Sequence, residues 1–156
     1  MIISNATILD FSTLGRRDGV DVEILGGRIA RIAPHGARAA AGPGTGADER
    51  PAPQPGEGPI DATGMYLVPG LVNTHCHAAM TLLRGAAEDC AVEDWFNRKI
   101  WIYEQNLTAE DVYWGSLLAH AEMLLAGVTC VADHYFAMAR AFEACEASGI
   151  RGDLAW

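Results

Sequence analysis

Apolar strand-like runs alternate with helix-like segments in the second half of the chain, and this order limits the possible folds more than any other feature. Strands are predicted at 71–72, 128–132 and 150–156, and helices at about 95–103, 108–127 and 137–147. Strands that alternate with helices are typical of a parallel α/β sheet. The best helix begins at Thr108, which forms a capping-box pattern with Asp111, and it ends at Gly127, a natural left-handed cap.

The first third is predicted to be β structure. Residues 2–9 are rich in aliphatic and β-branched side chains, and residues 20–25 alternate apolar and acidic residues. The pair Gly26-Gly27 supplies a tight turn, and 28–32 alternates back, which predicts a hairpin. A flexible Pro/Gly/Ala-rich loop is expected at about 34–59, followed by strand character at 60–67.

Two parts follow from this order. Residues 1–66 are expected to form a small β domain, and 67–156 the first β/α units of a parallel α/β domain. An eight-fold barrel needs roughly 200 residues, and only about 90 follow the β segment, so the fold class is α/β with an incomplete barrel. We therefore expect this chain to be a truncated reading of a longer protein.

Composition narrows the function. The net charge is −9, and Lys99 is the single lysine, so a nucleic-acid-binding surface is not expected. No run is long enough to span a bilayer, and no secretory signal is evident, so we expect no membrane association and a cytoplasmic location. The four cysteines have no paired spacing, which favours reduced thiols.

His75 and His77 carry the clearest chemical signal. They lie two apart at the end of an apolar run, so in a strand their imidazoles project to the same side. Two neutral imidazoles on one rigid strand are a natural start to a divalent metal site. A catalytic metal usually needs at least a third protein ligand, and no comparably placed residue follows in the sequence.

The sequence around this pair resembles a known family. The run 69–85, Pro-Gly-Leu-Val-Asn-Thr-His-Cys-His-Ala-Ala-Met-Thr-Leu-Leu-Arg-Gly, is similar to the amidohydrolase superfamily, in its methylthioadenosine/S-adenosylhomocysteine deaminase-like branch. That branch is related to the triazine aminohydrolases and chlorohydrolases. The resemblance extends through Trp95, Glu104, the 107–115 segment and 127–136, and it covers nearly the whole chain outside the loop.

The resemblance implies a fold and a chemistry. Residues before about 67 would be part of a β-sandwich, and the rest would begin a (β/α)8 barrel. His75 and His77 match metal ligands, with Zn²⁺ preferred and Fe²⁺ as the alternative, and Glu104 matches the residue that holds the ribose hydroxyls of a nucleoside. Metal-activated water would attack the aromatic carbon that bears the leaving group, C6 of an adenine in the deaminases. The remaining ligands and proton-transfer groups come from later strands in the family, so no catalytic residue is expected within this chain.

Several interpretations stay open. Trp95 is expected to pack rather than bind a ligand, and His134, at the end of a barrel strand, is expected to be a polar rim residue. The first hypothesis is a deaminase of an adenosine-type nucleoside, a hydrolase acting on C–N bonds. The alternatives are a non-catalytic or partner-dependent fragment, and a hydrolase of another aminated or chlorinated heterocycle. The expected partner is a small-molecule substrate, and homo-oligomer formation is left open.

Overall fold

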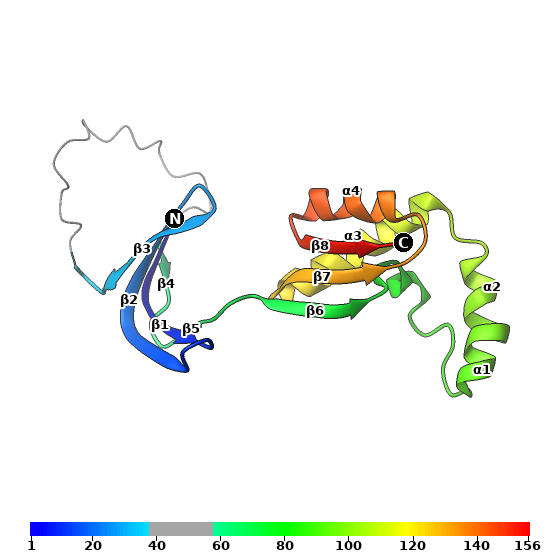
Figure 1. Cartoon of the computed structure of the whole chain (residues 1–156), viewed down its shortest axis with the longest axis horizontal. Helices are drawn as coiled ribbons and strands as arrows, with labels where there is room; N and C mark the ends of the chain where they lie inside the picture. Colours follow the sequence, from blue (N-terminus) through cyan, green and yellow to red (C-terminus); the bar gives the residue numbers. More distant parts are fainter. Residues whose placement is uncertain (38–57) are drawn as a thin grey trace. The chain divides into compact units, whose positions relative to one another are not determined.

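The computed structural model describes residues 1–37 and 58–156, which form two compact units, Met1–Pro69 and Gly70–Trp156 (Figure 1). The segment 38–57, which holds most of the predicted loop, lies outside the described residues. None of the helices in the described part is long and apolar enough to cross a bilayer.

The first unit is an antiparallel sheet with two short parallel additions. Its strands are β1 (Ile2–Asp10), β2 (Gly15–Leu25), β3 (Arg28–Pro34), β4 (Ile60–Asp61) and β5 (Tyr66–Leu67). The order is β3-β2-β1-β4, and β5 also pairs with β1. The predicted hairpin is confirmed, because β2 and β3 pair antiparallel across Gly26 and Gly27, which both have positive φ.

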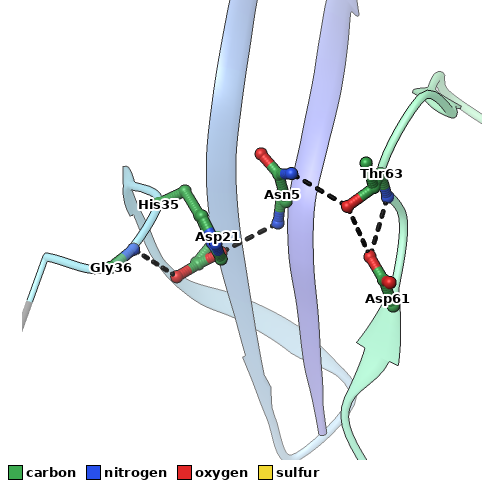
Figure 2. Close-up of polar contacts among 6 residues, drawn as sticks. All are labelled: Asn5, Asp21, His35, Gly36, Asp61 and Thr63. Carbon is green, nitrogen blue, oxygen red and sulfur yellow. Dashed lines mark hydrogen bonds and ion pairs between the residues drawn. The ribbon is translucent and has the colours of Figure 1, made fainter.

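A bulge in β1 is fixed by polar side chains. Asn5 has a left-handed φ of 57°, which asparagine tolerates better than most residues, and the β1–β2 register shifts there. Its backbone N–H donates to Asp21, which also accepts from His35 and from the Gly36 N–H (Figure 2). The Asn5 amide donates to Thr63, so the bulge links the hairpin to the turn after β4.

The second unit is a three-stranded parallel sheet in the order β6-β7-β8. Its strands are β6 (Leu71–Cys76), β7 (Val128–His134) and β8 (Arg151–Ala155). The helical segments are η1 (Ala78–Leu83), α1 (Val92–Asp94), η2 (Trp95–Ile100), α2 (Trp101–Glu104), α3 (Ala109–Leu125) and α4 (Met138–Ser148). The predicted strand–helix alternation is therefore confirmed, but no closed barrel is formed by the described residues.

The helices follow from local signals in most places. Thr108 and Asp111 make the predicted capping box, in which each backbone N–H is bound by the other residue's side chain. One difference is the segment before Glu104, where a single helix was predicted. There Trp95–Ile100 is π-helical between two short α-helical pieces. The sequence did not predict this difference, because hydrophobic spacing does not distinguish i→i+4 from i→i+5 hydrogen bonding.

The core of the second unit lies between the sheet and the helices. One cluster comprises Ala79, Val112, Tyr135, Met138 and Ala141, and a second comprises Val131, Cys145 and Ile150. His120 of α3 is fully buried, with Nδ1 3.3 Å from the Ser148 hydroxyl, so it is a packing residue. Burial lowers the pKa of His120, which favours its neutral form.

Candidate metal and substrate site

The predicted metal pair lies at the carboxyl end of β6. His75 is within the strand and His77 is the residue that follows it, at the start of η1. Both imidazoles are exposed and line the same small cavity, with ring centroids 5.1 Å apart and ring planes at 79°. The alternation of side chains along a strand therefore brings these two rings together on one side, as the spacing predicted.

The proton position on His77 is fixed by its neighbour strand. His77 Nδ1 lies 2.5 Å from the backbone carbonyl oxygen of His134, and a carbonyl oxygen can only accept. Nδ1 must therefore carry the proton and donate it, which leaves the Nε2 lone pair free in the neutral ring. This is the arrangement by which metal-ligating histidines are usually oriented, with the second nitrogen held by a carbonyl or carboxylate.

The geometry of the pair fits a zinc ion. Two imidazoles on one tetrahedral Zn²⁺, with Zn–N bonds of about 2.1 Å, have ring centroids about 5 Å apart. The observed separation of 5.1 Å agrees with that arrangement. Within residues 1–37 and 58–156, no group of three or more His, Cys, Asp or Glu side chains could hold a metal ion. The pair can thus supply two ligands, and a complete shell requires others.

Three consecutive residues at the end of β7 hold the parts of the site in place. Asp133 accepts a hydrogen bond from the Ala78 N–H at 3.2 Å, directly after His77 in the chain. His134 accepts from the His77 ring through its carbonyl oxygen, and Tyr135 donates from its hydroxyl to Glu104 Oε1 at 2.9 Å. The exit of β7 therefore contacts both the metal pair and the carboxylate that the sequence assigned to substrate.

Burial raises the pKa values of two of these groups. Asp133 is 3 % exposed, and burial raises the pKa of its carboxyl group above the usual value. Tyr135 is also buried, and burial together with the adjacent Glu104 carboxylate raises the pKa of its phenol. Tyr135 is therefore a neutral hydrogen-bond donor at physiological pH.

A larger cavity of ≈ 540 Å³ opens beside the pair, which is a usual size for a small-molecule site. Most of its wall is apolar and aromatic, and four residues add polar groups to it. The apolar lining is Met80, Trp95, Phe96, Trp101, Phe136 and Trp156, and the polar lining is His77, Glu104, His134 and Tyr135. The cavity thus joins one metal-pair histidine and the predicted substrate carboxylate in a single aromatic pocket.

The predicted residues take distinct places in this cavity. Glu104 is partly buried at the end of α2, and Trp95, which the sequence assigned to packing, lines the wall and also packs edge-on against Phe96. The His134 ring is exposed on the rim, with its centroid 6.2 Å from that of His77. The hydrogen bond with His77 is made by the backbone carbonyl oxygen of His134 and not by this ring.

Sequence reasoning did not single out Asp133 or Tyr135 as site residues. Their contacts join residues 55 and 31 positions apart, so no local spacing indicates them. One signal was available, because both lie at the carboxyl end of a predicted parallel strand, where barrel active sites are built.

Comparison with known proteins identifies the family. The model of the amidohydrolase family matches residues 66–155. The 5-methylthioadenosine/S-adenosylhomocysteine deaminase of Desulforudis audaxviator is 46 % identical over 155 residues, which cover 99 % of this chain and 33 % of that protein. The 5'-deoxyadenosine deaminase of Methanosarcina mazei is 56 % identical over 95 residues, 61 % of this chain and 22 % of that protein.

Solved structures agree with this result. The zinc-bound adenosine deaminase from Xanthomonas campestris superposes with a TM-score of 0.77 at 27 % identity, over 97 % of this chain and 32 % of that one. The zinc complex of atrazine chlorohydrolase from Arthrobacter aurescens shares the fold, with a TM-score of 0.74 at 22 % identity over 99 % of this chain and 35 % of that one. The chain spans about a third of the length of these relatives. With its sandwich-type sheet, its parallel β/α units and its His75/His77 strand, it belongs to the amidohydrolase family and corresponds to the N-terminal part of its relatives.

Proposed function

We propose that the protein carrying this chain hydrolytically deaminates an adenosine-type nucleoside of the 5'-methylthioadenosine/S-adenosylhomocysteine class. The observation that carries the proposal is the single cavity whose wall includes His77, Glu104 and several aromatic rings. A nucleoside needs an apolar slot for its base and polar acceptors for its ribose hydroxyls, and this cavity offers both.

The metal pair, Glu104 and the aromatic wall each have a role under this proposal. His75 and His77 hold a divalent ion, with zinc favoured because zinc is bound by the two structural relatives compared above. When bound, such an ion makes water nucleophilic at neutral pH. Glu104 accepts hydrogen bonds from the vicinal ribose hydroxyls, which places the base toward the histidines. The aromatic wall packs on the base and excludes water from it.

The identity of the substrate is supported by the relatives. Two of them are named as deaminases of 5-methylthioadenosine/S-adenosylhomocysteine and of 5'-deoxyadenosine, and a solved relative is an adenosine deaminase. All three names describe adenosine nucleosides, and they differ in what the 5' position carries.

The donor set favours a second proposal about the chain alone. Two imidazoles leave a tetrahedral shell half filled, and the described residues contain no group of three or more His, Cys, Asp or Glu side chains that could hold a metal ion. We infer that the ligands completing the shell come from outside the described residues or from a partner. The isolated 156-residue chain is then expected to bind metal weakly and to release no ammonia.

The test measures leaving-group release by the longest protein that carries this chain, with zinc present, as ammonia from the aminated substrates and as chloride from the chlorinated one. Adenosine, 5'-methylthioadenosine and S-adenosylhomocysteine are compared with an aminated and a chlorinated triazine. His75→Ala is expected to abolish activity, and His35→Gln, in the other unit, is the matched control and should retain it. Triazine turnover without nucleoside turnover would favour a different heterocycle, and no turnover of either class would sink the deaminase proposal.

A further inference from the structure

The hydrogen bond between Tyr135 and Glu104 joins the core of the second unit to its cavity. The Tyr135 side chain belongs to the buried cluster with Val112 and Met138, and the residue as a whole is 7 % exposed. Its hydroxyl nevertheless reaches Glu104 Oε1, 2.9 Å away in the cavity wall. A rigidly packed ring therefore presents one polar atom at a fixed point beside the carboxylate.

Glu104 needs such an anchor more than a strand residue would. It is the last residue of α2, a four-residue helix that follows the π-helical turn, and a glutamate side chain has three rotatable bonds. The negative end of a helix does not favour a carboxylate. Among the described residues, Tyr135 is the one side chain that donates a hydrogen bond to the Glu104 carboxylate.

The geometry leaves room for a ligand. A carboxylate has two oxygens with about four acceptor positions, and Tyr135 uses one of them. Oε2 is free of protein donors among the described residues, and Oε1 retains a second lone pair. Two hydroxyls on neighbouring carbons can therefore still be bound together, provided that the carboxylate plane is held in one orientation.

We propose that Tyr135 is a positioning residue that orients Glu104 for recognition of a vicinal diol. This rests on the proposed function, in which Glu104 binds the ribose hydroxyls. Tyr135 does not touch the substrate in this role, because its hydroxyl donates to the carboxylate and the carboxylate accepts from the ligand. The preference of the protein for a ribonucleoside over a nucleoside without these hydroxyls would then depend on a residue of the hydrophobic core.

The test compares adenosine with 2',3'-dideoxyadenosine in the longest protein that carries this chain. Tyr135→Phe keeps the ring and removes only the hydroxyl. It is expected to raise KM for adenosine about tenfold, with kcat changed much less, and to leave both constants for the dideoxy nucleoside within about twofold. Tyr103 is an exposed tyrosine one residue before Glu104. Tyr103→Phe is therefore the matched control and should have the same KM and kcat as the parent.

A double variant separates positioning from a structural role. Glu104→Gln should remove the preference for adenosine, and adding Tyr135→Phe to it should change KM no further, because the hydroxyl acts through the carboxylate. The positioning role would be overturned if Tyr135→Phe raised KM equally for both nucleosides. It would also be overturned if Tyr135→Phe raised KM further in the Glu104→Gln background. Thermal melting of each variant identifies a loss that comes from unfolding.

The two proposals fail in different ways. If Glu104→Gln leaves the preference for adenosine unchanged, the diol role of Glu104 falls, and the positioning role falls with it. If Glu104→Gln removes the preference and Tyr135→Phe preserves it, only the positioning role falls. As a readout without turnover, the ¹³C resonance of the Glu104 carboxyl is expected to move in Tyr135→Phe and to stay in place in Tyr103→Phe.

Discussion

His77 donates a hydrogen bond from Nδ1 to the backbone carbonyl oxygen of His134, across 2.5 Å and between the ends of two neighbouring strands. The bond determines the tautomer of His77 without using any side chain of the second strand. It also leaves the Nε2 atom of His77 without a proton and free to bind a metal. The carbonyl group that fixes this ring lies 57 residues further along the sequence. A metal-binding nitrogen is thus prepared by the backbone of β7.

Zinc binding by the chain should depend on the His77 ring and not on the His134 ring. His77→Ala or His75→Ala is expected to abolish the zinc-induced shifts of the imidazole resonances. His134→Ala keeps the carbonyl oxygen and should leave the zinc affinity within about threefold, less than the tenfold or greater effect of losing a supporting contact. Zinc titrations followed by ¹⁵N NMR measure this, and the same spectra report whether Nδ1 of His77 carries the proton. An equal loss of zinc affinity in His134→Ala and in His77→Ala would mean that the His134 ring is itself a zinc ligand.

Gly115 should not tolerate the alanine that helices usually favour. Replacing glycine by alanine inside a helix ordinarily stabilises it by about 1 kcal/mol. At Gly115 of α3 the new Cβ would lie 2.6 Å from the Ala79 carbonyl oxygen and 3.0 Å from Leu82 Cγ, so the helix and η1 must separate. Gly115→Ala is therefore expected to lower the free energy of unfolding by about 1–3 kcal/mol. Urea denaturation checks the sign, and a stabilised variant would contradict the close packing of α3 on η1.

Local patterns were predictable from the sequence and contacts between strands were not. The Gly26-Gly27 hairpin and the Thr108–Asp111 capping box are written within a few residues, so spacing alone indicates them. His75 and His77 were found because a strand places alternate residues on one side. The bonds from Tyr135 to Glu104 and from His77 to His134 depend on how β6, β7 and α2 pack together, and a single sequence does not encode that register in any short motif.

The sheet of the first unit should lose stability in acid through Asp21. The hydrogen bond from His35, followed by the Asn5 N–H, lowers the pKa of the Asp21 carboxyl group in the folded state. A lowered folded pKa gives stability that is present above the unfolded value, about 3.9, and that is lost as pH falls through the folded value.

Asp21→Asn should therefore be less stable than the parent at pH 7, and the difference should shrink toward pH 2. Urea unfolding followed by the resonances of Val20 and Val22, both buried in this sheet, measures the first unit by itself. Asp10 and Asp61 also have lowered pKa values, so the comparison is made as a difference between the two proteins, in which their contributions cancel. A difference that is constant across the pH range would contradict this account.

Asp133 should be needed as a hydrogen-bond acceptor more than as a charge. Its Oδ1 accepts from the buried Ala78 N–H, and its Oδ2 has no hydrogen-bond partner among the described residues. Asp133→Ala leaves the Ala78 N–H unpaired and is expected to cost about 1–3 kcal/mol of unfolding free energy. Asp133→Asn keeps an acceptor oxygen of the same shape and should recover most of that loss at pH 7.

The two variants also differ from the parent in pH dependence. Burial raises the folded pKa of the Asp133 carboxyl group, so ionisation opposes folding, and this part of the stability is present at low pH and lost as pH rises through the folded pKa. Asp133→Asn cannot ionise and should not show that decline, which urea unfolding at pH 3, below the unfolded value of about 3.9, and at pH 8 will detect. If Asp133→Asn were as unstable as Asp133→Ala at both pH values, the negative charge of Asp133 would itself be required. The exit of β7 would then hold His77 by electrostatic attraction rather than by the hydrogen bond from the Ala78 N–H to Asp133.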